Sequence, residues 1–195
     1  MKRIVLATNN MGKLREVRSL FPTYEVLTLK DIGFMDDIVE DGKTFEENAI
    51  IKAKTISLKY NCITLADDSG LSVEALDGAP GIYSARYSLE QTDESNNALL
   101  IKNLEGKENR RAKYVCALCV FHPNGEFKTV CETCEGLIID DARGTNGFGY
   151  DPHFYIPSLG KTFAEVSLEE KNKLSHRAKA LRKLKEICNE DFSFK

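Results

Sequence analysis

Strand-like and helix-like segments alternate along almost the whole chain, and this alternation constrains the fold more than any other feature. Runs rich in β-branched and apolar residues occupy residues 3–8, 24–29, 62–66, 71–75, 110–121, 127–133 and 154–156. Between them, apolar residues recur at helical spacing in residues 14–21, 44–60, 93–104 and 167–187. Interleaving of this kind is typical of an α/β fold.

The turn Asn124-Gly125 shows that the predicted sheet is not all parallel. It joins the runs at residues 110–121 and 127–133, and Asn-Gly between two strands is a strong hairpin signal. Strands joined by a hairpin are antiparallel. We therefore predict an α/β fold with a mixed central sheet and flanking helices, organised as a single domain over residues 1–195.

Composition and charge exclude several classes of function. At 195 residues the chain is long enough to bury a core as one domain, or as two small lobes that share a core. A net charge of −3 with mixed signs indicates no general nucleic-acid or anionic-membrane binding. Apolar runs stay below the ~18 residues of a membrane span, and Ile4 to Ala7 is too short for a signal-peptide core. These features predict a cytoplasmic protein without nucleic-acid or membrane partners.

Two cysteine pairs, Cys116-x-x-Cys119 and Cys131-x-x-Cys134, imitate a zinc ribbon. Both pairs lie in strand-like segments, where positions three apart face opposite sides, so neither pair is expected to bind one metal ion. We expect buried free thiols in a reducing compartment instead. A zinc-ribbon nucleic-acid module is the alternative that depends on these pairs.

The most distinctive stretch is Asp67-Asp68-Ser69-Gly70, which follows the apolar run at residues 62–66. Because Gly70 allows the backbone to turn, we expect the strand to end at the two acids. That ending places the carboxylates where open α/β sheets bind their ligands. Adjacent residues of an extended chain point in opposite directions, so one acid is expected to face a site. An ordinary acidic turn is the alternative.

A polar loop from Thr8 to Lys13 lies between the first predicted strand and the first predicted helix. A strand, a loop with Gly-Lys and then a helix is the layout of a phosphate-binding loop, which uses free backbone N–H groups and the positive helix end. It is not a Walker A loop, because the leading glycine is absent and Leu14 replaces the Ser or Thr. An ordinary turn between strand and helix remains the alternative.

Lys52 is expected on the second helix, which opens with the capping box Thr44-Phe45-Glu46-Glu47. Helical spacing puts Lys52 on a different face from the buried apolar stripe. A lysine in that position is commonly just solvated. Glu40, which precedes the turn before this helix, is equally uninformative by itself.

Two further stretches near the C-terminus are unusual. Glycines alternate with aromatic residues from Gly144 to Pro152, which lets the backbone approach a flat ligand on which Phe148 could stack. Ser175 could act as a new N-cap that interrupts the last helix. Such a break would turn Lys171, His176 and Arg177 towards one ligand.

Taken together, these stretches resemble the inosine/xanthosine triphosphate pyrophosphatase family over nearly the whole chain. Asn9 stands where many members of that family carry glycine. The motifs, in family order, are Thr8-x-Asn10-x-Gly12-Lys13, Thr44-Phe45-x-Glu47-Asn48-Ala49, Ala66-Asp67-Asp68-Ser69-Gly70-Leu71, Gly78-Ala79-Pro80-Gly81-x-Tyr83-Ser84-Ala85-Arg86, Gly147-Phe148-Gly149-Tyr150-Asp151-Pro152 and Ser175-His176-Arg177.

The resemblance implies hydrolysis of ITP, dITP and XTP to the monophosphate and pyrophosphate, with Mg²⁺, by a homodimer. It also implies an elongated sheet and two lobes around an active-site cleft. Glu40 and Asp68 are hard oxygen ligands suited to Mg²⁺. Asp68 is further expected to orient or deprotonate the attacking water, with Asp67 in a supporting role.

The remaining site residues are assigned to the substrate. Lys13, Lys52 and Lys171 supply positive charge for the triphosphate, and Ser69 contacts a phosphate or the sugar. His176 and Arg177 donate to the oxygen at position six of the base, while Asp151 accepts from a ring N–H. The predicted substrate-binding loops are completed by Thr8, Asn9, Asn10, Met11, Gly12, Phe148, Gly149 and Tyr150. A broader nucleotide pyrophosphatase and a nucleotide sensor without turnover are the alternatives.

Overall fold

The computed structural model describes residues 2–189 and 192–194 and contains a mixed seven-stranded sheet in the order β2-β1-β3-β4-β5-β6-β7. Strand β1 pairs in parallel with β2 and β3, whereas β6 pairs antiparallel with β5 and β7. The predicted mixed α/β class is confirmed. The strands are β1 (Lys2–Leu6), β2 (Tyr24–Leu27), β3 (Thr64–Val73), β4 (Arg111–Phe121), β5 (Phe127–Ile138), β6 (Phe154–Ile156) and β7 (Lys161–Thr162).

The helices begin where the sequence supplies caps. The Thr44 side chain accepts a hydrogen bond from the Glu47 N–H at the start of α2, and Ser167 forms a complete capping box with Glu170. In the described part of the chain, no helix is both long and apolar enough to cross a membrane. The helices are α1 (Met11–Leu20), α2 (Phe45–Tyr60), α3 (Asp93–Asn103), α4 (Leu168–Leu174) and α5 (His176–Ile187), with short 3₁₀ helices η1 (Glu74–Leu76), η2 (Gly81–Arg86) and η3 (Phe163–Glu165).

The chain divides into two compact units. Unit 1 comprises Met1–Asp68, Cys116–Glu132 and Arg177–Lys195, and unit 2 comprises Ser69–Val115 and Thr133–His176. The long strands β3, β4 and β5 each contribute residues to both units.

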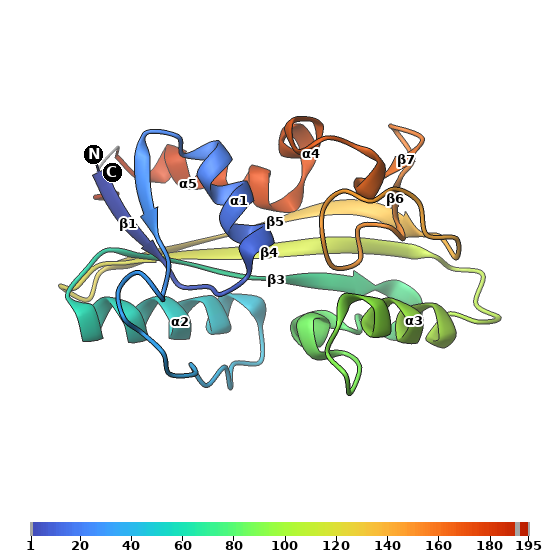
Figure 1. Cartoon of the computed structure of the whole chain (residues 1–195), viewed down its shortest axis with the longest axis horizontal. Helices are drawn as coiled ribbons and strands as arrows, with labels where there is room; N and C mark the ends of the chain where they lie inside the picture. Colours follow the sequence, from blue (N-terminus) through green and yellow to red (C-terminus); the bar gives the residue numbers. More distant parts are fainter. Residues whose placement is uncertain (1, 190–191, 195) are drawn as a thin grey trace. The chain divides into compact units, whose positions relative to one another are not determined.

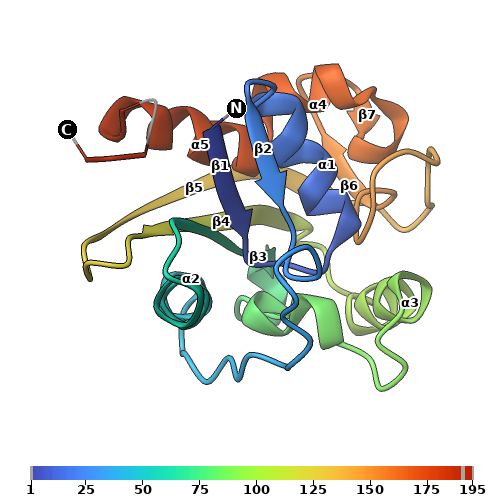
Figure 2. The ribbon, with the colours of Figure 1, turned by 60° about the vertical axis from the view of Figure 1, so that its left-hand side comes forward.

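Unit 1 is a layered structure in which helices cover both faces of its strands. Helices α1 and α5 lie on one face and α2 lies on the other (Figure 1). Leu65 and Cys116 face α1 and α5, whereas Ala66 and Cys119 face α2. Strands β1 and β2 run side by side in the same unit (Figure 2). The alternation confirms that the two cysteines of Cys116-x-x-Cys119 point to opposite faces.

Unit 2 has its own apolar core, built by parts of the strands together with the helices of this unit. Apolar side chains of α3 and η3 pack against those of β3, β4, β5 and β6 in one cluster. Its most deeply buried members are Leu71, Val73, Leu100, Leu104, Phe154 and Phe163.

The prediction that a strand ends at Asp67-Asp68 is wrong. Strand β3 continues through both acids and through Gly70 to Val73. Gly70 is needed for a close approach and not for a turn, because a Cβ there would collide with Ser84 Oγ and lie 2.6 Å from the Gly81 carbonyl oxygen. The two acids do point in opposite directions, as predicted for adjacent strand residues, since Asp67 contacts Arg177 and Asp68 contacts Lys52.

The cysteines are only partly as predicted. Cys116, Cys119, Cys134 and Cys188 are buried and free, but Cys131 is exposed and Cys62 is half-buried. Cys131 follows the buried Val130 in β5, and adjacent strand residues face opposite sides, so its side chain lies on the exposed side. Within residues 2–189 and 192–194, no group of three or more His, Cys, Asp or Glu side chains is arranged to hold a metal ion.

Candidate active site

Glu40, Lys52 and Asp68 form an acid–lysine cluster in unit 1, in which Lys52 and Asp68 are buried and Glu40 is half-buried. Helix α2 carries Lys52 on the face that meets β3, so its Nζ lies 2.9 Å from Asp68 Oδ1 and 2.8 Å from Glu40 Oε2. The two carboxylate oxygens are therefore separated by no more than the sum of those distances. Lys52 is buried on the same face of α2 as Ala49 and Ile56, so the prediction that it lies on a different face from the apolar stripe is wrong, and it is not simply solvated.

The charges in this cluster shift the pKa values of its members. Burial raises the pKa of Asp68, and the charges of Lys52 and Lys13 offset this only in part. Burial by itself would lower the pKa of Lys52, but the charges of Asp68 and Glu40 raise it overall. Lys52 therefore stays a cation between the carboxylates. Asp68 Oδ2 is buried and has no hydrogen-bond partner among the residues that the structure describes.

A second charged cluster in unit 1 surrounds Asp67 on the opposite face of β3. Lys13 Nζ lies 2.6 Å from Asp67 Oδ1, and Arg177 Nε lies 2.6 Å from Asp67 Oδ2. Arg177 Nη1 also contacts Glu16 Oε2. The Cys116 thiol donates to Asp67 Oδ2 at 3.3 Å. Asp67 thus holds two of the predicted substrate-binding cations, Lys13 and Arg177, in place.

The pKa shifts follow from this arrangement. Burial by itself would raise the pKa of Asp67, but Arg177 and Lys13 together hold it well below the usual range of a carboxyl group. Burial and the charge of Asp67 raise the pKa of the Cys116 thiol. Asp67 is consequently an ionised partner of buried cations, and Cys116 is a protonated donor.

The loop from Thr8 to Lys13 already uses several of the N–H groups that we predicted for phosphate. Thr8 N–H donates to the Leu6 carbonyl oxygen, Asn10 N–H to Thr8 Oγ1, and Lys13 N–H to Asn10 Oδ1. Asn10 is thereby the N-cap of α1. In the described structure, the N–H groups that these bonds leave for a ligand are those of Asn9, Met11 and Gly12.

Asp151 is the centre of the predicted site residues in unit 2. Lys171 Nζ lies 2.6 Å from Asp151 Oδ2, and the Tyr114 hydroxyl donates to Asp151 Oδ1 at 3.2 Å. The Phe148 N–H donates to Asp151 Oδ2 at 3.0 Å. The imidazole of His176 stacks on the Tyr114 ring, with centroids 4.7 Å apart. In this structure, the donor of Lys171 and the acceptor of Asp151, both predicted for substrate, meet each other.

Ser175 interrupts the last helix as predicted. Helix α4 ends at Leu174, Ser175 is extended with φ −65° and ψ 155°, and α5 begins at His176. The break leaves Lys171 and His176 in unit 2 and Arg177 in unit 1. Their approach to one ligand stays a prediction.

Three other predicted substrate-binding residues, Ser69, Tyr150 and Met11, differ in how far they are buried. Ser69 follows Asp68 in β3 and is half-buried in unit 2. Tyr150 is buried, and its hydroxyl donates to the Ser84 carbonyl oxygen at 2.7 Å, so it anchors its loop to the core. Met11 is largely exposed.

Sequence reasoning missed Glu16, Tyr114 and Cys116. Glu16 is an acid on the buried face of α1, one helical turn after the buried Gly12, and a carboxylate at such a position signals a buried cation. Tyr114 and Cys116 lie two residues apart in the apolar strand β4, a position that indicates core residues. Nothing in a strand pattern distinguishes a hydroxyl or thiol that donates to a carboxylate from one that only packs.

Comparison with known proteins places the chain in context. The sequence profile described as the Ham1 family matches residues 4–187. The dITP/XTP pyrophosphatase of Bacillus licheniformis is 50% identical over 195 residues, covering 97% of this chain and 100% of that protein. The protein of the same name from Bacillus subtilis is 47% identical over 192 residues, covering 96% of this chain and 97% of that protein.

Solved structures agree with the sequence comparison. The Staphylococcus aureus Ham1 protein has a TM-score of 0.86 and 44% identity, covering 95% of this chain and 97% of that one. A Mycobacterium abscessus structure described as a nucleoside-triphosphatase and dITP/XTP pyrophosphatase has a TM-score of 0.76 and 39% identity, covering 93% of this chain and 98% of that one.

Proposed function

The chain belongs to the Ham1 family, and from that premise we propose that it is a nucleoside triphosphate pyrophosphatase that hydrolyses dITP and XTP to the nucleoside monophosphate and pyrophosphate. Relatives about half identical over nearly the full length carry the name dITP/XTP pyrophosphatase. The observation that carries the proposal is the acid–lysine cluster of Glu40, Lys52 and Asp68. ITP is a further substrate in this proposal, because it presents the same base as dITP.

Glu40 and Asp68 are the residues that would hold Mg²⁺. Both offer carboxylate oxygens, and Mg²⁺ in phosphate chemistry is commonly held by one or two carboxylates plus waters and substrate phosphates. Asp68 Oδ2 is a buried acceptor with no hydrogen-bond partner in the described part of the chain, so it fits a cation or a metal-bound water. When bound, Mg²⁺ supplies positive charge that neutralises the phosphate oxygens and polarises them.

Asp68 is the residue that orients the attacking water and accepts its proton. Lys52 holds Asp68 Oδ1, which fixes the carboxylate, and Oδ2 is the oxygen left for the water. Burial raises the pKa of Asp68, which makes it a better proton acceptor while it remains ionised. Lys13 and Lys52 provide positive charge for the phosphates, in accord with chemistry that depends mainly on positioning and neutralisation.

Recognition of the base is assigned to the remaining residues by the resemblance. Phe148 stacks on the purine, Asp151 accepts from a ring N–H, and His176 and Arg177 donate to the oxygen at position six. Donors that meet an amino group instead of that oxygen are left unpaired. The resulting discrimination against adenine nucleotides is ~10⁴-fold or more. A homodimeric state and a cytoplasmic location are further parts of the proposal.

The test is incubation of the purified protein with dITP, XTP, ITP, GTP and ATP, with Mg²⁺, and measurement of both pyrophosphate and orthophosphate. We expect pyrophosphate as the primary product from the first three nucleotides and little from ATP. Turnover should stop on addition of EDTA and return with excess Mg²⁺. Orthophosphate as the primary product would place the cleaved bond elsewhere and refute the proposal.

A further inference from the structure

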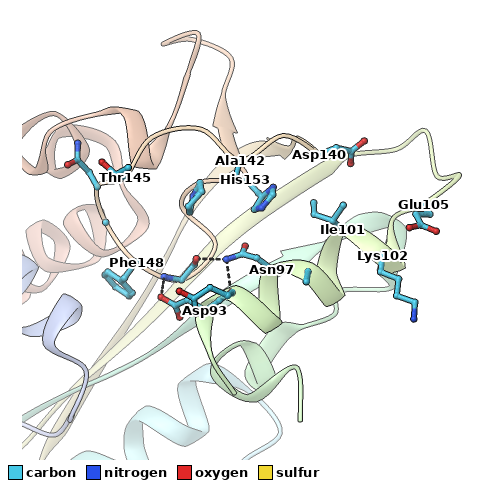
Figure 3. A pocket seen from close by; sticks show the side chains of 16 residues that line it. Asp93, Asn97, Ile101, Lys102, Glu105, Asp140, Ala142, Thr145, Phe148 and His153 are labelled. Carbon is cyan, nitrogen blue, oxygen red and sulfur yellow. Dashed lines mark hydrogen bonds between the residues drawn. The ribbon is translucent and has the colours of Figure 1, made fainter. Parts of the chain in front are cut away.

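The backbone of Gly149 is held at both of its polar groups by helix α3 of unit 2. Gly149 N–H donates to Asp93 Oδ2 at 2.7 Å, and Asn97 Nδ2 donates to the Gly149 carbonyl oxygen at 2.8 Å (Figure 3). Asn97 Nδ2 also donates to the Asp93 carbonyl oxygen at 2.8 Å. Because one amide nitrogen meets two carbonyl oxygens, the opposite orientation of the amide would set oxygen against oxygen.

The residues on either side of Gly149 are also fixed. Phe148 N–H donates to the buried carboxylate of Asp151, and the Tyr150 hydroxyl donates to the Ser84 carbonyl oxygen. Lys171 Nζ lies 5.0 Å from the centroid of the half-buried Phe148 ring. Each residue of Phe148-Gly149-Tyr150 therefore has at least one hydrogen bond to an anchor in unit 2.

This degree of anchoring is notable because the segment is rich in glycine. Gly144, Gly147 and Gly149 all have positive φ, and Gly149 itself has φ +62°. A glycine-rich segment has many accessible conformations, so holding one of them needs specific contacts. Binding is stronger when the binding conformation is held before the ligand arrives.

We propose that Asp93 and Asn97 are positioning residues, which hold the backbone of Gly149 and so fix the ring of Phe148 for stacking on the purine base. The inference rests on the proposed function for its ligand. Neither residue touches the substrate in this account, since both act through the peptide groups on either side of Gly149. Loss of either contact should weaken nucleotide binding more than it slows the chemical step.

Asn97→Ala tests the carbonyl contact, and Asn103→Ala is its matched control. Asn103 lies on the same helix but is exposed, and its side chain donates to the Tyr87 hydroxyl. With dITP and Mg²⁺, we expect Asn97→Ala to raise KM by about 10-fold, the scale of a lost base–aromatic stacking contact. We expect kcat to stay within about 2-fold, and Asn103→Ala to match the wild-type protein.

A double-mutant cycle separates positioning from general damage. If Asn97 acts through Phe148, then Asn97→Ala should change KM little in the Phe148→Ala background. An equally large effect in that background would overturn the proposal. So would a fall in kcat/KM that comes from kcat alone.

Asp93 offers a rescue test for the N–H contact. Asp93→Ala removes the acceptor for Gly149 N–H, whereas Asp93→Asn keeps an oxygen that can accept. Asp93→Ala should raise KM, and Asp93→Asn should restore most of the loss. Glu94→Ala is the control, because it removes another acid from the first turn of α3. Equal effects of Asp93→Ala and Glu94→Ala would indicate only helix destabilisation and overturn the proposal.

Amide hydrogen exchange gives a readout that does not depend on turnover. Exchange of the Gly149 amide should be faster in Asp93→Ala than in the wild-type protein, and unchanged in Glu94→Ala. Unchanged exchange in Asp93→Ala would refute the anchoring whatever the kinetics show. If the wild-type protein releases no pyrophosphate but exchange accelerates as expected, the proposed function and the role of Phe148 fail while the anchoring by α3 stands.

Discussion

Replacement of Asp67 by asparagine removes the charge that Lys13 and Arg177 both contact, with almost no change in side-chain shape. Removal of one partner from a buried ion pair costs about 3–5 kcal/mol of unfolding free energy, because an uncompensated charge is left inside. Two features of the structure favour the lower end of that range of unfolding free energy. The Lys13 side chain is 13% exposed, and Arg177 keeps its contact with Glu16. We therefore expect Asp67→Asn to lose about 3 kcal/mol at neutral pH.

The assay is urea unfolding followed by circular dichroism, with Asp36→Asn as the control. Asp36 forms an ion pair with Lys59 at 2.9 Å in the same unit, but both side chains are largely exposed. Exposed pairs of this kind contribute little, so Asp36→Asn should unfold like the wild-type protein. A loss below about 1 kcal/mol for Asp67→Asn, or equal losses for both variants, would refute the argument from burial.

The effect of Asp67 should also depend on pH. Arg177 and Lys13 hold its pKa in the folded protein well below the usual value of a carboxyl group. A carboxyl group with a lowered folded pKa contributes stability that is fully present above its unfolded pKa and is lost as the pH falls towards the folded pKa. The difference in unfolding free energy between wild type and Asp67→Asn should therefore be constant near neutral pH. It should shrink as the pH falls below the pKa of Asp67 in the unfolded chain. A difference that grows on acidification would contradict this sign.

Further predictions concern Asp68, Gly70 and two of the cysteines. Asp68→Asn should lower turnover of dITP by ~10² or more while nucleotide binding stays measurable by calorimetry; an equal loss of both would indicate a structural acid. Gly70→Ala should cost about 1–3 kcal/mol in thermal or urea unfolding, because its Cβ has no room beside Ser84 and Gly81; an unchanged midpoint would contradict the close approach. Cys131 should react with a thiol reagent in the folded protein while Cys116 reacts only after unfolding, since burial raises the pKa of Cys116; early modification of Cys116 would count against it.

The sequence predicts those helices and strands whose signals, caps and apolar stripes, lie within the segment itself. The helix capped by Thr44 and the capping box of Ser167 appear where expected, and the strand at Phe154–Ile156 has the predicted bounds. The end of β3 was mispredicted because Gly70 was assigned a local role. The reason for that glycine is a contact with η2, more than ten residues away, and no local pattern contains it.

The site was predictable in its residues but not in their pairings. Glu40 and Asp68 were expected to lie together, and the structure joins them through Lys52. The sequence indicated Lys13 and Arg177 as cations for substrate, yet it could not show that Asp67 and Glu16 hold them. Pairings of this kind depend on how α1, α5 and β3 meet, which is a property of packing and not of spacing along the chain.

The uninterrupted course of β3 through Asp67 and Asp68 has a consequence for how this segment can change. The two neighbouring carboxylates serve opposite faces, one towards Lys13 and Arg177 and the other towards Lys52. Insertion or deletion of one residue ahead of them would exchange the faces, leaving each set of cations opposite the wrong neighbour. The number of residues in this stretch is thus constrained as strictly as the identity of its two acids.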